Sequence, residues 1–205
     1  MLTRRPSFPN NNTKTYKNMA VTATCPEIKD VLAANECLEN FGGLGVNVYV
    51  FNKADLKAPL KPEKNIYPAL TSESFNTGKG LYKFECKDSS QGHSFESLGR
   101  RGGYKQQIDF VLESVNAESA EVGRALNNLD LGYIFQDGEK NIIVYDPQHK
   151  VEYASGGIKG DTGKKSDDER SVVCSGTLQP TTYGRYEIAE PETGGWDSLL
   201  ASKKE

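Results

Sequence analysis

The chain has 205 residues, of which 36% are hydrophobic and 26% charged, which suits one domain with arms better than two typical domains. No run reaches the roughly 18 apolar residues that a membrane-spanning helix needs, so no membrane span is expected. The formal net charge is −3, and four cations lie in the first 18 residues, so residues 19–205 carry −7. This acidic body argues against a protein that grips nucleic acid by neutralising its phosphates.

Residues 1–18 contain Arg4 and Arg5 but no apolar stretch after them, so they cannot act as a secretory signal. We expect a disordered leader or arm here, with Met19 opening the structured part of the chain.

The first predicted strand covers residues 44–51, where Leu44, Val46, Val48 and Val50 alternate with polar and aromatic residues. Glycines 42, 43 and 45 precede it and allow a tight turn into the strand. A phosphate-binding loop would lead into a helix, usually with a Lys-Ser or Lys-Thr pair, so no nucleotide site is expected.

The next segment is rich in proline, and after it the alternation of apolar and polar residues resumes. Residues 56–70 carry three prolines, which predicts irregular or edge structure. Residues 81–87 and 103–114 alternate with a period of two, and in the second run Tyr104, Gln106, Ile108, Phe110 and Leu112 share a face. Each of these strands should have one buried face and one wet face.

Residues 116–130 form the convincing helix of the sequence, with Asn116 as its N-cap. Val122, Ala125, Leu126 and Leu129 recur at spacings of three and four, giving a narrow apolar stripe. We expect this helix to cover a sheet.

The second half of the chain predicts a hairpin and several further strands. Residues 131–136 and 141–146 flank an Asp-Gly turn signal, and strands follow at 150–155, 170–178 and 183–188. Residues 156–170 contain four glycines and eight charged residues that sum to zero, which predicts a long mobile loop.

No catalytic, cofactor-binding or metal site is expected. His93 and His149 both lie in turn-like settings, and no nucleophile elbow or metal-binding histidine pair occurs. The acidic run 167–169 lacks the alternate ligand spacing of a calcium loop. The cysteines show no CxxC spacing, and the two in strand-like runs are expected to be small buried hydrophobes; the four are Cys25, Cys37, Cys86 and Cys174.

From residue 36 to 190 the order of elements resembles the major tail tube proteins of tailed bacteriophages. The similarity lies in a glycine-rich turn into a strand, a long strand before the helix, a hairpin, a glycine-rich loop and a closing strand rich in Thr and Tyr. It implies a mainly β fold, a β-sandwich or barrel-like tail tube domain with one flanking α-helix. We expect this domain over residues 19–190 and a C-terminal tail over 191–205, whose Trp196, Leu199 and Leu200 can dock on a neighbour.

The resemblance also implies a role and a set of partners. Six copies would form a ring by joining sheets edge to edge, and rings would stack into a tube in the virion, contacting other tail proteins. DNA would pass through the lumen without specific binding, and the chain would be made in the host cytoplasm and would not be an enzyme. In such a tube the loop 156–170 can reach the next ring and form ion pairs there.

Two alternatives remain. The first is another phage structural protein: a tail terminator, a head-tail connector or a head decoration protein. The second is a β-sandwich glycan-binding or hydrolase domain, which would use aromatic residues exposed in a groove.

Overall fold

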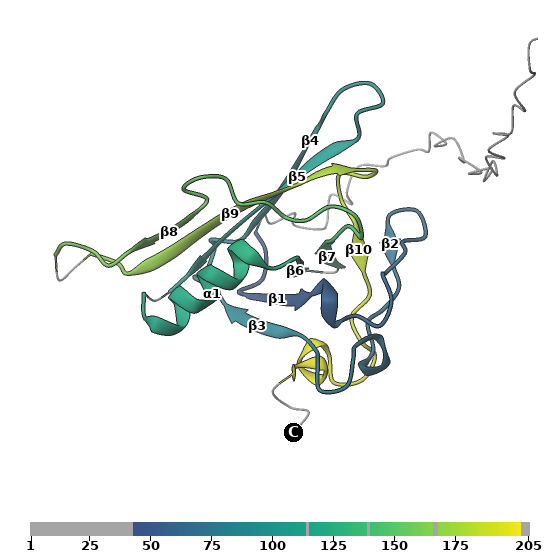
Figure 1. Ribbon diagram of the computed structural model, residues 1–205, viewed down its shortest axis with the longest axis horizontal. Coiled ribbons are helices and arrows are strands. Elements are labelled where there is room, and N and C mark those ends of the chain that lie inside the picture. Colours follow the sequence, from purple (N-terminus) through teal and green to yellow (C-terminus); the bar gives the residue numbers. More distant parts are fainter. Residues whose placement is uncertain (1–42, 114, 139, 166–167, 202–205) are drawn as a thin grey trace, which may run out of the picture. The chain divides into compact units, whose positions relative to one another are not determined.

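The computed structural model describes residues 43–113, 115–138, 140–165 and 168–201. It is mainly β, with two sheets and, within these residues, a single α-helix, as the sequence predicts (Figure 1). The leader 1–18, Met19, Cys25, Cys37, Gly42 and Asp167 lie outside the described residues.

The first sheet has six strands, in the order β2-β10-β7-β6-β1-β3. All neighbours are antiparallel except β2 and β10, which run parallel. The strands are β1 (Asn47–Asn52), β2 (Ile66–Tyr67), β3 (Tyr82–Glu85), β6 (Leu131–Asp137), β7 (Lys140–Val144) and β10 (Glu187–Ile188).

The second sheet has four antiparallel strands, in the order β4-β5-β9-β8. They are β4 (Gly92–Ser97), β5 (Tyr104–Leu112), β8 (Ile158–Asp161) and β9 (Ser171–Thr181). From Gln106 to Leu112 the buried residues of β5 alternate with half-buried ones, so the alternation predicted within 103–114 is confirmed there, whereas Tyr104 is only half-buried.

Helix α1 (Ala117–Asn128) begins where the sequence predicts. The Asn116 side chain accepts a hydrogen bond from the Ser119 N–H at 2.7 Å, and the Ser119 hydroxyl accepts one from the Asn116 N–H at 2.8 Å. Leu126 is buried and Val122 packs on the same core, but the helix ends at Asn128 and Leu129 is 43% exposed. The apolar stripe is therefore shorter than predicted.

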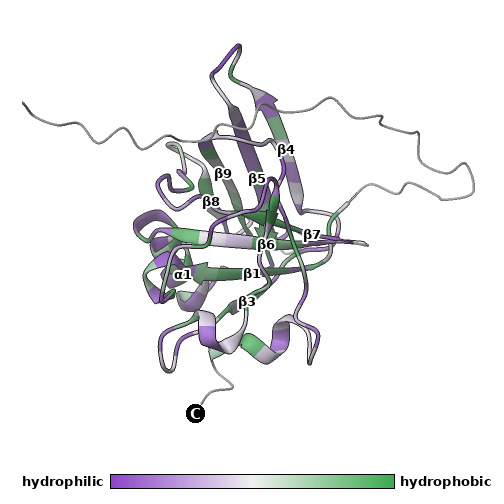
Figure 2. Ribbon diagram, turned by 90° about the vertical axis from the view of Figure 1, so that its right-hand side faces the viewer, coloured by the Kyte–Doolittle hydropathy of each residue, from purple (hydrophilic) through white to green (hydrophobic). Residues whose placement is uncertain are grey.

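A first core fills the space between the two sheets and α1. Figure 2 shows hydrophobic residues along β1, β5 and β6, and the larger buried side chains here include Phe110, Tyr133 and Phe135. A sandwich of this kind buries the inward face of each sheet.

A second core lies on the other face of the six-stranded sheet. Tyr49 and Phe51 of β1 point into it, whereas Val48 and Val50 point into the first core. Both faces of β1 are therefore buried, because β1 is a central strand covered on both sides. Val46, which alternates in step with Val48 and Val50, is 41% exposed.

The second core is closed by irregular segments and three short 3₁₀ turns, η1 (Lys53–Asp55), η2 (Ser72–Ser74) and η3 (Trp196–Leu199). The proline-rich stretch 56–70 contains only the short edge strand β2, as predicted. Trp196 and Leu199 are buried in this core, so they dock on their own chain rather than on a neighbour.

The second half of the chain departs from prediction at three places. Residues 150–155 form only one bridge, between Glu152 and Thr177, and 183–188 contribute only the two residues of β10. Within the predicted loop 156–170, residues 158–161 form strand β8, which pairs with β9. The predicted hairpin of β6 and β7 is present, with Gly138 at φ +48° in its turn.

Candidate assembly surface

The outer face of the four-stranded sheet is wet and polar. In β5 the inward residues are buried, while the alternate positions are half-buried and face away from the core. The same holds along most of β9, where Val172, Cys174 and Leu178 are buried. The outward residues are Ser94, Glu96, Lys105, Gln107, Asp109, Val111, Ser171, Val173, Ser175 and Thr177, called the wet face below.

Both edges of this sheet are open in the described part of the chain. Strand β4 forms one edge, and its residues 94–97 are all exposed. Strand β8 forms the other edge, and residues 159–161 are exposed. An exposed edge offers unpaired N–H and C=O groups to another strand.

The outward groups of β8 can be assigned from its ladder. The Ser175 N–H donates to the Gly157 carbonyl at 2.7 Å. In an antiparallel ladder the backbone N–H and C=O groups of every second residue, here 157, 159 and 161, therefore face β9. Ile158 and Gly160 therefore direct their N–H and C=O groups away from the sheet.

The turn joining β4 to β5, residues 97–103, is called the hairpin tip (Figure 1). Leu98 is 43% exposed, and Arg100 and Arg101 are both exposed. The tip is closed by bonds from the Leu98 N–H to the Gly103 carbonyl at 2.9 Å and from the Gly102 N–H to the Gly99 carbonyl at 3.0 Å.

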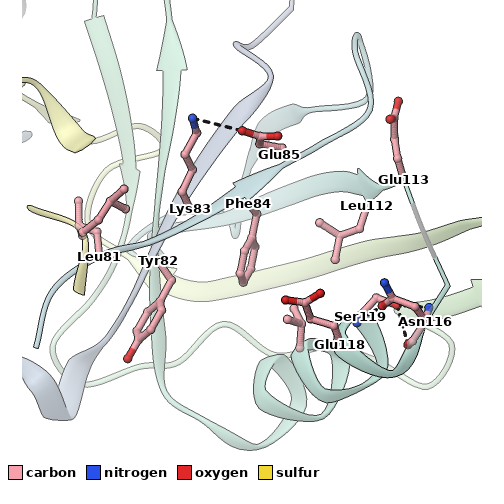
Figure 3. A pocket seen from close by; sticks show the side chains of 12 residues that line it. Leu81, Tyr82, Lys83, Phe84, Glu85, Leu112, Glu113, Asn116, Glu118 and Ser119 are labelled. Atoms are coloured by element: carbon pink, nitrogen blue, oxygen red, sulfur yellow. Dashed lines mark hydrogen bonds and ion pairs between the residues drawn. The ribbon is translucent and has the colours of Figure 1, made fainter. Parts of the chain in front are cut away.

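A groove of about 700 Å³ lies between β3 and the first turn of α1, and is called the β3/α1 groove. Figure 3 shows Tyr82 and Phe84 pointing to the α1 side of β3, opposite to Lys83 and Glu85. The lining also includes Leu112 and three carboxylates, those of Glu85, Glu113 and Glu118. Lys83 forms an ion pair with Glu85 at 3.4 Å.

His93 belongs to a polar network inside the fold. Its Nε2 lies 3.3 Å from Oε1 of Gln106, whose Nε2 donates to the Thr181 hydroxyl at 3.3 Å and to the Tyr183 carbonyl at 3.0 Å. Burial lowers the pKa of His93 below its usual 6.5, an effect opposed by the bond to Gln106. The network ties the start of β5 to the end of β9.

His149 lies elsewhere, in the turn after β7. Its Nδ1 is 2.9 Å from Oδ1 of Asp146, and the Asp146 carboxylate also accepts the N–H groups of Gln148 and His149. The two histidines therefore each have a local structural role. Among the described residues no group of three His, Cys, Asp or Glu side chains is placed to hold a metal ion.

The cysteines in the described part of the chain are free and buried, as expected of small hydrophobes. Burial raises the pKa of the Cys86 thiol to about 11 and that of the Cys174 thiol to about 12. Neither is activated as a nucleophile.

The charged part of the segment 156–170 is partly used inside the chain. The Asp168 carboxylate accepts the N–H groups of Lys164 and Lys165 at 2.7 and 2.9 Å, which lowers its pKa. Glu169 forms an ion pair with Lys87. Asp168 therefore closes its own loop and Glu169 binds a lysine outside that loop, where the sequence suggested contacts with a neighbouring ring.

Sequence reasoning did not find the hairpin tip or the β3/α1 groove. The signal for the tip was local, since "LGRRGG" sets two arginines among glycines between two alternating runs. The groove had no such signal, because its lining residues come together only through the pairing of the strands.

Comparisons with protein-family models, curated proteins and solved structures give no match. None of the described helices is long and apolar enough to cross a membrane.

Proposed function

We propose that this protein is a structural subunit, without catalytic activity, that assembles into stacked hexameric rings forming the tail tube of a bacteriophage virion. The observation that carries the proposal is the four-stranded sheet, which has a buried face, a polar face and, among the described residues, two open edges. A soluble protein rarely leaves two edges of one sheet unprotected unless another chain completes them.

Joining β4 of one copy to β8 of the next would pair the free backbone N–H and C=O groups of both edges at once. Repeated around a ring, this joins the four-stranded sheets of all copies into one closed barrel, which removes the edges of those sheets. Barrels of roughly 16 to 18 strands already leave an aqueous channel, and six four-stranded sheets supply more strands than that. The ring would therefore be hollow.

The wet face suits the lining of such a channel for DNA. Five of its ten residues are Ser, Thr or Gln, and Lys105 on it is paired with Glu96 at 2.8 Å. A conduit needs a surface along which phosphates move without being held, and a surplus of lysine and arginine would hold them. The rings would stack in the virion and contact other tail proteins at the tube ends.

The β8 edge offers a sharp test. Gly160→Pro removes an N–H that points away from the sheet, so the ladder to β9 stays intact while pairing with a neighbour is blocked. Gly160→Ala is the matched control, because an added Cβ meets only ordinary contacts, 3.8 Å from Val172 and 3.9 Å from Val115, and the N–H remains.

In size-exclusion chromatography and negative-stain images, the parent and Gly160→Ala proteins should form rings or tubes, and Gly160→Pro should remain monomeric with an unchanged β circular dichroism spectrum. Tubes formed equally well by Gly160→Pro would contradict pairing through β8.

The rival reading as a glycan-binding domain has one observation in its favour. Tyr82 is 45% exposed in the β3/α1 groove, where a sugar ring could stack on it. Under that reading Tyr82→Ala would abolish sugar binding and the purified protein would be a monomer. Under the proposed function no sugar binds, and Tyr82→Ala leaves the ring intact.

A further inference from the structure

The hairpin tip and the β3/α1 groove carry opposite charges. Arg100 and Arg101 are exposed, and neither has an ion pair within the described part of the chain. Three carboxylates from three elements line the groove, those of Glu85 on β3, Glu113 after β5 and Glu118 on α1. In Figure 3 Glu118 lies on the side of Tyr82 and Phe84, whereas Glu85 and Glu113 point to the other side. Its one cation, Lys83, is already paired with Glu85.

The apolar parts of the two surfaces also match. Leu98 is 43% exposed at the tip, next to the two arginines in sequence. The floor of the groove contains Tyr82, Phe84 and Leu112, which are apolar and come from two different strands. Arginine at the tip and aromatic residues in the groove are residue types that are enriched at interfaces.

The conformation of the tip is a second and independent observation. Arg101 has φ +66°, a left-handed conformation that glycine adopts at little cost and arginine does not. Three other residues of the tip are glycines, namely Gly99, Gly102 and Gly103. Sparsely populated backbone conformations of this kind cluster at binding sites and switch regions.

The two surfaces cannot meet within one copy. Strand β5 connects the two surfaces, because it begins at Tyr104 beside the tip and ends at Leu112 in the groove. Eight residue steps at about 3.4 Å each separate these ends by about 27 Å. A contact between them must therefore join two copies, either reciprocally in a closed twofold dimer or head to tail in a ring or filament.

We propose that the hairpin tip of one copy docks into the β3/α1 groove of a second copy, with Leu98 over Tyr82 and Phe84 and the two arginines beside Glu113 and Glu118. This deepens the proposed function, on which its biological setting rests, by naming a second contact between copies besides the joined sheet edges. The occupant of the groove is thus another molecule of the same chain.

Charge reversal on each surface tests the docking in the full chain. The tip variant is Arg100→Glu with Arg101→Glu, and the groove variant is Glu113→Lys with Glu118→Lys. A third variant, Lys57→Glu with Lys61→Glu, is the control, because it makes the same charge change as the tip variant at exposed residues away from both surfaces. Thermal unfolding establishes that every variant is folded.

Analytical ultracentrifugation then measures association. We expect the tip and groove variants each to lose at least about tenfold in association constant, since like charges oppose one another at the contact. A 1:1 mixture should recover it, because each copy then offers the charge that the other needs. The control variant should associate like the parent.

The outcomes separate the docking from the proposed function. If the mixture associates but electron micrographs show no hollow rings, the docking is supported and the proposed tail tube function is contradicted. If the parent forms rings and the tip variant forms them equally well, the docking is overturned and the tube stands. Loss of DNA binding by the tip variant, with association unchanged, would assign the arginines to nucleic acid and also overturn the docking.

Discussion

Gln106 has no exposed surface, yet its amide is hydrogen-bonded on both sides, to His93 through Oε1 and to Thr181 and Tyr183 through Nε2. Gln106→Leu removes these bonds and leaves the buried partner groups without a hydrogen bond, so the free energy of unfolding should fall by about 1–3 kcal/mol. Gln107→Leu, the next residue on the wet face, is the control and should change it by less than about 0.5 kcal/mol. Urea denaturation measures both, and equal effects would contradict the role of the network.

His93 should make the fold sensitive to mild acid. Burial places its pKa in the folded state below 6.5, with Arg185 lowering it further and Gln106 and Asp137 opposing the shift. The unfolded chain therefore binds more protons as the pH falls through 6.5, so this contribution to stability is present above pH 6.5 and is lost below it. Melting temperature should fall more steeply from pH 7.5 to 5 in the parent than in His93→Gln. Parallel curves would rule out His93 as the cause.

At the scale of elements, the C-terminal turn η3 belongs to the fold. Trp196 is 1% exposed and lies 6.1 Å from Tyr49, measured between ring centroids. Trp196→Ala should lower the free energy of unfolding by about 3–5 kcal/mol, as for other large buried side chains. Trp196→Phe should cost much less, because the buried Nε1 has no hydrogen-bond partner among the described residues.

Chemical denaturation of the purified protein decides this point. If both variants were as stable as the parent in the unassembled state, Trp196 would instead serve a contact with a neighbour, as its spacing in the sequence had suggested.

Elements with a local signal were predictable from the sequence. The alternation along β5 and the cap at Asn116 depend on residues close in the chain, and both are present. The two buried faces of β1 were not predictable, because Tyr49 and Phe51 are covered by segments from 56 to 199. Strand β8 was not predicted for a similar reason. Its own sequence of glycines and charged residues indicates a loop, but pairing with β9 holds it as a strand.

At the scale of the whole molecule, the candidate surfaces come from topology. The tip arises where β4 turns into β5, while the groove needs β3, β5 and α1 to converge. Arg100 and Glu118 are close in sequence but are separated by the length of β5, so charge counting along the chain could not relate them as surfaces of two copies. The absence of a catalytic motif suggested a protein that works through its surface, and we propose that the edges of β4 and β8, open among the described residues, form that surface.

The central claim is that copies of this chain join through β4 and β8 into hollow sixfold rings. Cryo-electron microscopy of the purified full chain at high concentration tests it most directly. We expect rings or tubes in which β4 of each copy hydrogen-bonds to β8 of the next, with the wet face lining the channel and a buried area between copies above the roughly 1,600 Å² of a standard interface. Monomers alone at every concentration, or rings whose β4 and β8 edges remain unpaired, would contradict the claim.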